Sequence, residues 1–402
     1  MKASSVGSFS LWLPDGTAGY TISDIKNALA KGKNIAREEL DTPALVLDLD
    51  VFERNVKKMA EACRTNHIAF RPHTKTHKCP EIARLQLNSG AVGICTAKVG
   101  EAEVMVNAGI QNVHITSPVV TQQKINRLMD IRQKSPGVMV VIDNPHNVKD
   151  LSDAALSRGF VLNVLVDINP LGHMRTGSPP GQPAVDLAKI IVQSKGLRLR
   201  GIQSYAGGAQ HIARFETRRQ KSLEMLAPAV ETKEMMIKEG LPVEIFTGGG
   251  SGTYNIDYEL KGFTDVQVGS YIFMDVQYLI IGGKGFSDNE YKDFESSLTV
   301  VTTAISKPTD KAITIDAGYK AFSTDGPKPL LKNLPGYQYN WGGDEHGILT
   351  YENPERELKI GDRVEAIIPH CDPTVNLYDN YFCVRNGKVE DIWAVAGRGK
   401  CQ

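Results

Sequence analysis

The residue types that point most directly to chemistry lie in residues 71–78, with the sequence RPHTKTHK. If this stretch continues a strand, residues two apart along it share one face. The residues that share a face in that case are Ala69, Arg71, His73, Lys75 and His77. Several titratable groups are costly in an ordinary core, because unpaired buried charges are unfavourable. At the C-terminal end of a barrel strand they would form an active-site wall, whereas the alternative is a basic loop after a short strand.

Lys75 is the best candidate for a nucleophile on this face. Burial and cationic neighbours lower the proton affinity of a lysine, and a neutral amine attacks an aldehyde. We therefore predict that Lys75 loses proton affinity and holds an aldehyde cofactor as a Schiff base, with His73 also in contact with that cofactor. Lys78 has the opposite phase along the strand, so we expect it to be solvated.

Two glycine-rich segments could bind a phosphate group of the same cofactor. Residues 247–253 (TGGGSGT) follow the seventh predicted barrel strand, and residues 268–271 (VGSY) follow the eighth. Glycines let main-chain N–H groups converge on an anion, and barrels commonly bind phosphate with these two loops. One such loop is explained equally well as a flexible turn, but two loops opposite a lysine indicate a cofactor with an aldehyde and a phosphate. The predicted contacts are Thr247, Gly249, Gly250, Ser251, Gly252 and Tyr271.

A candidate metal pair, His370 and Asp372, follows an apolar run in the sequence IPHCDPT. In extended geometry the two side chains share a face and offer one nitrogen and one oxygen ligand, while Cys371 points away. This mixed pair suits Mn²⁺, Mg²⁺ or Zn²⁺, with positions left open for water or substrate. The alternative interpretation is a capped strand end without a metal.

Other polar residues follow the predicted strands and could complete the site. Arg175, after the fifth strand, could bind the phenolic oxygen of the cofactor or be an ordinary surface arginine. Gln203 and Tyr205 follow the sixth strand, where the tyrosine could stack near a cofactor ring or pack in the core. His211 is expected to be structural. His346, in the polar turn DEHG, could transfer a proton, although a solvated loop explains it as well.

The elements that would position these residues alternate along the middle of the chain. We predict eight strands, most followed by a helix, and several are the nearly continuous apolar runs of strands buried on both faces. Eight such units favour a (β/α)₈ barrel over an open doubly wound sheet. The predicted strands lie near residues 67–75, 92–96, 112–117, 138–143, 161–167, 199–204, 243–247 and 265–270.

The chain is predicted to divide into three parts. The barrel domain is expected over residues 44–288, beginning with a strand at 43–49 and a helix capped by Asp50. Short strands without long helices then predict a mainly β domain over residues 289–402. Residues 1–43 fit neither pattern and are expected to pack on the β domain.

Composition argues against several classes of function. Lys+Arg and Asp+Glu both total 46 in 402 residues, so no net charge favours nucleic acid or an anionic membrane as a partner. No apolar run approaches the roughly 18 residues of a membrane span. The six cysteines show no paired spacing, which predicts reduced thiols, and the first residues make a poor signal peptide. We therefore expect a soluble cytoplasmic protein.

Seven motifs in one order resemble the D-threonine aldolase and D-serine dehydratase group. That group belongs to the alanine-racemase-like, fold-type III enzymes that use pyridoxal 5'-phosphate (PLP), and the resemblance spans residues 41–400. The motifs are RPHTKTHK (71–78), GIQSYAGGAQH (201–211), TGGGSGT (247–253), QVGSYIFMD (267–275), DAGYKAFSTD (316–325), GDEHG (343–347) and PHCDPT (369–374).

The resemblance implies a PLP-binding barrel joined to a β domain. It also implies a homodimer in which the barrel mouth of one subunit faces the β domain of the other. Lys75 would be the Schiff-base lysine, and His370 with Asp372 would bind a divalent cation. The resemblance further supports as cofactor contacts Arg175, Tyr205, Ser251, Gly252 and Tyr271.

Position 372 distinguishes the two activities of the group. In the dehydratases of this group the corresponding pair is His-x-Cys, which binds zinc, whereas in the aldolases it is His-x-Asp. Residue 372 of this sequence is Asp, so the pair resembles that of the aldolases. The resemblance thus implies a lyase that cleaves D-β-hydroxy-α-amino acids, first D-threonine to glycine and acetaldehyde, with D-3-hydroxyaspartate close behind. The alternatives are a D-serine or D-3-hydroxyaspartate dehydratase and, outside enzymes, a PLP-carrier protein, against which the long β domain argues.

Overall fold

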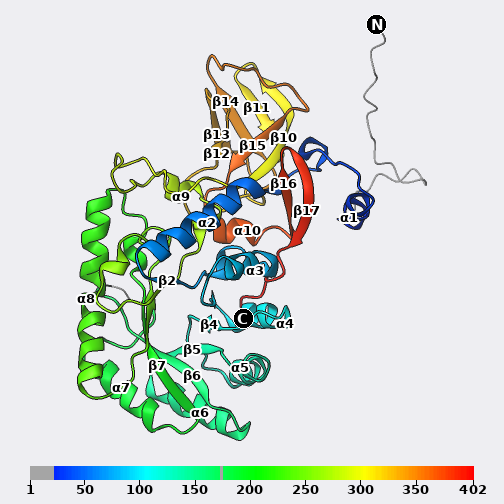
Figure 1. Ribbon diagram of the computed structural model, residues 1–402. Helices are drawn as coiled ribbons and strands as arrows, with labels where there is room; N and C mark the ends of the chain where they lie inside the picture. Colours follow the sequence, from blue (N-terminus) through cyan, green and yellow to red (C-terminus); the bar gives the residue numbers. More distant parts are fainter. Residues whose placement is uncertain (1–21, 173–174) are drawn as a thin grey trace.

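Eight parallel strands form a closed barrel in the computed structural model, which describes residues 22–172 and 175–402 (Figure 1). Their order around the barrel is β2-β9-β8-β7-β6-β5-β4-β3. Backbone hydrogen bonds from Val92 N to Phe70 O (3.1 Å) and from Cys95 N to Pro72 O (2.7 Å) join the two ends. The predicted barrel is therefore confirmed. The strands are β2 (Ala69–Phe70), β3 (Ile94–Thr96), β4 (Val113–Ile115), β5 (Met139–Ile142), β6 (Leu162–Asp167), β7 (Leu197–Ser204), β8 (Ile245–Gly248) and β9 (Asp265–Val266).

Helices connect the strands and lie around the barrel (Figure 1). Helix α2 is capped by Asp48, whose side chain accepts a hydrogen bond from Val51 N at 3.0 Å, rather than by Asp50 as we predicted. Such a cap satisfies an amide that the first helical turn leaves free. The helices are α2 (Leu49–Thr65), α3 (Pro80–Asn88), α4 (Val99–Asn107), α5 (Gln122–Lys134), α6 (Pro145–Ser157), α7 (Gln182–Gln193), α8 (Phe215–Lys238) and the short α9 (Val276–Leu279).

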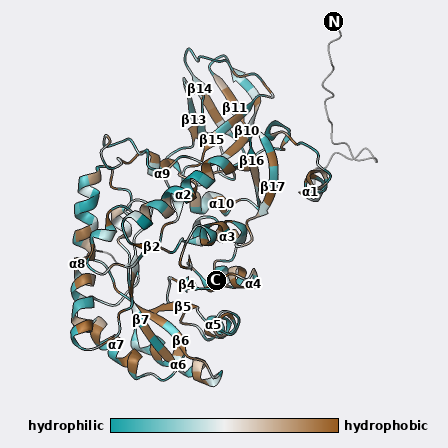
Figure 2. Cartoon of the chain, in the orientation of Figure 1, coloured by the Kyte–Doolittle hydropathy of each residue, from teal (hydrophilic) through white to brown (hydrophobic). Residues whose placement is uncertain are grey.

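The apolar runs predicted as strands are buried on both faces. All four residues of β5 are buried, as are five of the six in β6. Figure 2 shows that α8, which lies on the outside of the barrel, carries both hydrophobic and hydrophilic residues. Burial on both faces explains why β5 and β6 are nearly continuous apolar runs.

The second domain contains a nine-stranded sheet whose main path is β13-β14-β11-β10-β1-β16-β17, with β12 and β15 beside it. Strand β1 (Ala44–Asp48) pairs with β10 and β16, so it lies in this sheet and not in the barrel domain where we had placed it. The remaining elements are β10 (Leu298–Thr309), β11 (Ala312–Ile315), β12 (Leu330–Leu331), β13 (Tyr337–Trp341), β14 (Gly347–Tyr351), β15 (Arg363–Ile367), α10 (Cys371–Val375), β16 (Asn380–Arg385) and β17 (Lys388–Ala394).

Helix α1 (Ile22–Ala30) lies on the β domain, beside β17 (Figure 1). Its buried residues Ile25 and Ala28 form a small cluster with Val389 and Ile392 of β17. The part of the N-terminal segment that the structure describes thus packs where we expected, and residues 1–21 lie outside the described residues.

Two further expectations concern membranes and thiols. Within residues 22–172 and 175–402, no helix combines the length and the apolar character needed to cross a membrane. All six cysteines are free thiols, and five of them are buried.

Candidate active site

A cavity of about 590 Å³ lies at the C-terminal ends of the barrel strands. This is the end at which barrel enzymes place their catalytic residues. The predicted residues that line it are His73, Lys75, Arg175, Gln203, Tyr205, Gly249, Gly250 and Ser251. Those that do not line it in the described chain are Thr247, Gly252, Tyr271, His346, His370 and Asp372.

Lys75 reaches the cavity from a 3₁₀ turn, Thr74–Thr76, and not from a strand. Strand β2 ends at Phe70, so the face-sharing argument that selected Lys75 does not apply to it. The turn is fixed in part by the backbone N–H of Lys75, which donates to Nδ1 of His73 at 3.3 Å. Lys78 is also placed differently from our prediction, because it is buried in an ion pair with Glu101 of α4.

The ammonium of Lys75 lies 2.7 Å from Oδ2 of Asp372, at the start of α10. This contact joins the predicted cofactor lysine to the predicted metal pair. The carboxylate stabilises the ammonium and raises the pKa of Lys75 well above its ordinary value, which is opposite to the shift we predicted. Burial raises the pKa of Asp372, but Lys75 outweighs burial, so the net shift is downward.

The loops after β8 and β9 fit a phosphate group. Both loops line the cavity, and the backbone amides of Ser251, Gly269 and Ser270 donate to no other protein atom among the described residues. Gly249 adopts φ +66°, and a Cβ added to Gly269 would lie 2.5 Å from Oγ1 of Thr76. Unpaired amides in a concave, glycine-lined loop are the donors that an anion requires.

Gly252 is needed for the shape of this loop, although it does not line the cavity itself. A Cβ there would lie 2.1 Å from the backbone oxygen of Gln210, so the loop would have to shift. We expect Gly252→Ala to raise the dissociation constant for PLP about tenfold, or 1.4 kcal/mol, in an absorbance titration of the apoprotein. The matched control is Gly208→Ala, whose new Cβ would meet its nearest neighbour at an ordinary 3.7 Å. Equal affinities of the two variants would contradict this prediction.

Gln203 lines the cavity, but its amide is fully occupied by protein partners. Its Oε1 accepts from Nε2 of Gln267 at 3.1 Å and lies 2.9 Å from Nε2 of His114. Its Nε2 donates to Oδ1 of Asp167 at 2.9 Å and to the carbonyl of Thr116 at 3.2 Å. Four hydrogen bonds use the whole capacity of an amide side chain. Gln203 therefore serves to hold the floor of the cavity rather than to bind a cofactor directly.

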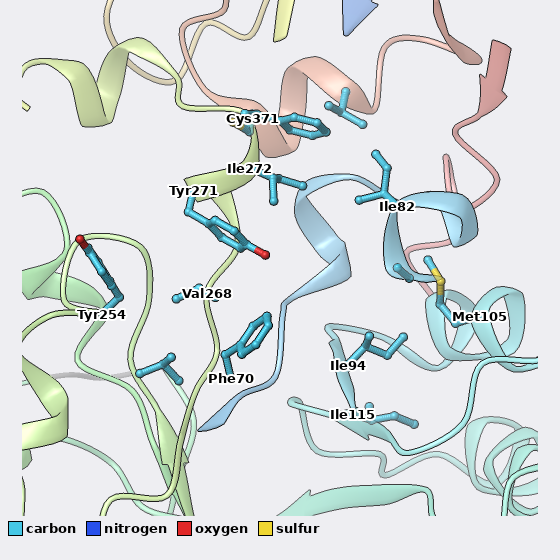
Figure 3. Packing of buried hydrophobic residues seen from close by; sticks show 14 of the residues in the cluster. Phe70, Ile82, Ile94, Met105, Ile115, Tyr254, Val268, Tyr271, Ile272 and Cys371 are labelled. Atoms are coloured by element: carbon cyan, nitrogen blue, oxygen red, sulfur yellow. The ribbon is translucent and has the colours of Figure 1, made fainter. Parts of the chain in front are cut away.

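Thr247 and Tyr271 are likewise committed to the protein. The hydroxyl of Thr247 donates to Oδ1 of Asp265 at 2.7 Å. The ring of Tyr271 lies in the hydrophobic core near Val268 (Figure 3), and its hydroxyl accepts from Nε2 of Gln86 at 3.0 Å. Neither side chain has the access that we predicted for a cofactor contact.

The buried carboxyl group of Asp167, beside Gln203, should make the stability of the folded protein depend on pH. Burial raises the pKa of Asp167 to about 6, although hydrogen bonds from Gln203 and Thr176 oppose the shift. An acid with a raised pKa in the folded state contributes stability at low pH, and that contribution is lost as the pH rises through about 6. We expect Asp167→Asn to match the wild type near pH 4. At pH 7.5 it should be more stable by up to about 3 kcal/mol in urea unfolding.

A difference between the two proteins that does not change with pH would contradict this account of Asp167. Asparagine is a suitable replacement, because its amide oxygen can still accept the hydrogen bond that Gln203 donates.

The predicted metal pair lies at the N-terminus of α10, because the helix begins at Cys371. Our expectation of extended geometry through Asp372 is therefore wrong, although both side chains remain close to the barrel mouth. Nδ1 of His370 lies 2.7 Å from Oδ2 of Asp325, which orients the ring and leaves Nε2 for a ligand. Oδ1 of Asp372 is buried and has no hydrogen-bond partner. Cys371 points into the core beside Ile272, as predicted (Figure 3).

These donors fit a divalent cation with open coordination positions. One imidazole nitrogen and one carboxylate oxygen suit Mn²⁺, Mg²⁺ or Zn²⁺. The described residues contain no cluster of three or more His, Cys, Asp or Glu side chains that could hold a metal alone. Water or substrate would therefore complete the coordination.

Arg175 and Tyr205 lie together at the cavity, with the guanidinium 5.3 Å from the centre of the tyrosine ring. The ring of His211 contacts that of Tyr278, which also lines the cavity, in a tilted arrangement with 4.5 Å between the ring centres. His346 is exposed in the turn between β13 and β14 and does not line the cavity of its own chain. The predicted proton-transfer role of His346 is thus not supported within one subunit.

Three residues of the site were missed from the sequence. Thr76 and Ser270 line the cavity, and Oγ1 of Thr76 is buried without a hydrogen-bond partner. Both lie inside motifs that had been identified, so their hydroxyls were the available signal. Asp325 ends the motif DAGYKAFSTD, but no spacing rule links it to His370, which follows 45 residues later.

Comparison with known proteins gives consistent matches over most of both domains. A model of the alanine racemase N-terminal domain matches residues 47–277, and one of a putative serine dehydratase domain matches residues 297–384. The 3-hydroxy-D-aspartate aldolase of Paracoccus denitrificans (strain Pd 1222) is 36% identical over 363 residues, or 90% of this chain and 93% of that protein. The D-threonine aldolase of an Arthrobacter species is 36% identical over 371 residues, or 92% and 95%.

A solved structure gives the same result. The crystal structure of D-threonine aldolase from Filomicrobium marinum is 36% identical in sequence and has a TM-score of 0.87. The comparison covers 92% of this chain and 98% of that one.

Proposed function

Because the chain belongs to the alanine-racemase-like family of PLP-dependent enzymes that includes D-threonine aldolase and D-serine dehydratase, we propose that it is an aldolase of D-β-hydroxy-α-amino acids. The proposed enzyme depends on PLP and a divalent cation. The observation that carries the proposal is the 2.7 Å contact between Lys75 and Asp372, beside His370. This contact supports the proposal because it brings the lysine proposed to form the Schiff base next to the proposed nitrogen–oxygen ligand pair.

Different residues of the cavity are proposed to bind different parts of PLP. Lys75 would bind its aldehyde, and the amides of Ser251, Gly269 and Ser270 would bind its phosphate. Arg175 and Tyr205 lie at the same cavity and are proposed to contact its ring and phenolic oxygen, with His73 nearby. When bound, PLP supplies an electron sink for the charge left on the substrate Cα.

His370 and Asp372 are proposed to bind the cation next to Lys75. Asp325 keeps the His370 ring in place, and Asp275 fixes the start of α10 by accepting a hydrogen bond from Cys371 N at 2.8 Å. A cation held there would act as a Lewis acid on the β-hydroxyl of the substrate and lower its pKa. Transfer of that proton to a base would let the aldehyde C=O form while the Cα–Cβ bond breaks and its electron pair passes to Cα.

The experiment that tests the proposal is incubation of the PLP-loaded protein and Mn²⁺ with D-threonine, D-3-hydroxyaspartate and D-serine. The aldolase produces glycine together with acetaldehyde or glyoxylate, and D-serine serves as the dehydratase substrate. Ammonia and a keto acid without glycine would instead identify a dehydratase. Absence of turnover on all three would favour a PLP-carrier protein.

We also propose a homodimer, on the grounds of the family resemblance. His346 lies away from the cavity of its own subunit, so any role at an active site requires a second copy. A molar mass in solution near twice 44.0 kDa would support the dimer. A monomeric protein that is fully active would contradict it.

A further inference from the structure

Lys98 is a cation of the cavity that has no role in the binding of PLP or of the metal described above. It lies between β3 and α4, is exposed, and lines the cavity together with Thr116 and Ser117. Among residues 22–172 and 175–402, its ammonium has no carboxylate or hydrogen-bond partner. The cavity also contains Lys75 and Arg175, which are already proposed to bind the aldehyde and the phenolic oxygen of PLP.

A buried carboxylate holds the backbone at Lys98 in a fixed place beside the turn that carries Lys75. Glu101, in the first turn of α4, forms a buried ion pair with Lys78, which follows that turn. The other oxygen of this carboxylate, Oε2, accepts a hydrogen bond from the backbone N–H of Ala97 at 2.8 Å. One side chain therefore joins the residue before Lys98 to the turn of the lysine proposed to form the Schiff base.

The order of the strands places Lys98 and the proposed phosphate loops on opposite sides of Lys75. Strand β2, which leads to Lys75, lies between β9 and β3, because a bridge between His73 and Cys95 closes the barrel there. The proposed phosphate loops follow β8 and β9, whereas Lys98 follows β3. A ligand that joins the cofactor at Lys75 can therefore meet Lys98 on the side away from the phosphate.

The anion that remains to be bound is the α-carboxylate of the substrate. Every α-amino acid carries this group on Cα, the carbon that also bears the amine. A carboxylate in a cavity is unfavourable without a charged or hydrogen-bonded partner. The cavity lining contains a carboxylate of its own, Asp143, but its oxygens accept from Asn144 Nδ2 at 2.9 Å and from Gly177 N at 3.2 Å. Lys98 therefore remains available for a ligand.

We propose that Lys98 binds the α-carboxylate of the substrate. The inference rests on the proposed function, which requires an amino acid as substrate. A hydrogen bond between an ammonium and a carboxylate is stronger than one between neutral groups. Because the carboxylate is unchanged when the Cα–Cβ bond breaks, this contact stabilises the bound substrate and the transition state alike. Its loss should therefore raise KM and leave kcat nearly unchanged.

The test compares glycine with methylamine, which has an amine but no carboxylate. The absorbance of the cofactor in the PLP-loaded protein gives a dissociation constant for each compound, in the wild type and in Lys98→Met. Methionine keeps the apolar stem of the side chain but removes the charge. We expect the variant to bind glycine about 30-fold more weakly and methylamine less than about threefold more weakly. A general distortion of the cavity would weaken both compounds equally.

Two further variants and one kinetic measurement complete the test. Lys98→Arg keeps a cation and should bind glycine within about fivefold of the wild type. The matched control is Lys195→Met, at an exposed lysine in the turn between α7 and β7, at the opposite end of the barrel, and it should change neither constant. For cleavage of D-threonine, Lys98→Met should raise KM about 30-fold and change kcat less than about threefold.

An unchanged preference for glycine over methylamine in Lys98→Met would overturn the assignment of Lys98. A raised KM for D-3-hydroxyaspartate alone, with D-threonine unaffected, would also overturn it, since Lys98 would then meet the β-carboxylate. In both cases, release of glycine from D-threonine by the wild type would leave the proposed function in place. If the wild type released glycine from neither substrate, the proposed function would be wrong, and the comparison of glycine with methylamine would still decide the carboxylate contact.

Discussion

Lys75→Ala is expected to lower kcat for cleavage of D-threonine by at least about 10³-fold. The variant should also lose the visible absorbance band of the bound cofactor. The reason is that an amine must bind the aldehyde of PLP, and Lys75 brings its ammonium to the cavity beside Asp372. Steady-state kinetics and an absorbance spectrum of the variant measure both effects.

The matched variant is Lys75→Arg. It keeps a positive charge near Asp372 but removes the nucleophilic amine, because a guanidinium stays protonated. We expect it to be as inactive as Lys75→Ala. Activity of Lys75→Arg above about 1% of wild type would mean that the charge of Lys75, and not its amine, is what the reaction needs.

Asp372→Asn is expected to abolish stimulation by Mn²⁺ and to lower kcat/KM by about 10³-fold, while the PLP absorbance band persists. The amide keeps the shape of the side chain but removes the anionic oxygen, including the buried Oδ1 that has no protein partner. The loss should therefore affect the metal-dependent step and spare the binding of the cofactor. Activity measured across a series of Mn²⁺ concentrations tests this.

Asp325→Asn provides the graded comparison for Asp372→Asn. Asp325 contacts His370 and not the cation, so its loss should weaken Mn²⁺ binding by about 10–100-fold and be overcome by added Mn²⁺. If Asp372→Asn were also rescued fully by added Mn²⁺, Asp372 would not be a ligand. An Asp372→Asn enzyme with undiminished activity would remove the metal pair from the account.

The barrel was predictable because several of its strands are nearly continuous apolar runs that alternate with helical patterns, and all eight strands occur at the predicted places. The end of the first barrel strand, β2, was not predictable, because the turn at Thr74–Thr76 depends on tertiary contacts. Lys75 was therefore selected correctly on a wrong assumption about strand phase. Lys78 shows the same limit, since its partner Glu101 comes from a different helix.

The assignment of β1 to the barrel domain was wrong for a topological reason. Residues 44–48 show no regular alternation of polar and apolar residues, so their sequence fits a buried strand of either domain. In the structure, β1 is inserted between β10 and β16. Both partners follow it by more than 240 residues, and no local pattern records such pairing. The domain that a strand joins is decided by these distant partners.

The loops of the site were predictable from glycine and hydroxyl content, but individual contacts were not. Gln203, Thr247 and Tyr271 have the right types and lie near the cavity, yet their polar atoms are used by distant residues. A side chain is free for a ligand only if its neighbours leave it unpaired. That property depends on the folded barrel and cannot be read from spacing.

The central claim, that Lys75 carries the cofactor, is tested most directly by reduction of the PLP-loaded protein with borohydride followed by peptide mass mapping. Reduction converts the Schiff base into a stable secondary amine at the lysine that formed it. We predict a pyridoxyl-phosphate adduct on the peptide that contains Lys75, and no such adduct in Lys75→Ala. An adduct on another lysine, such as Lys98 at the same cavity, or no adduct on the wild type, would contradict it.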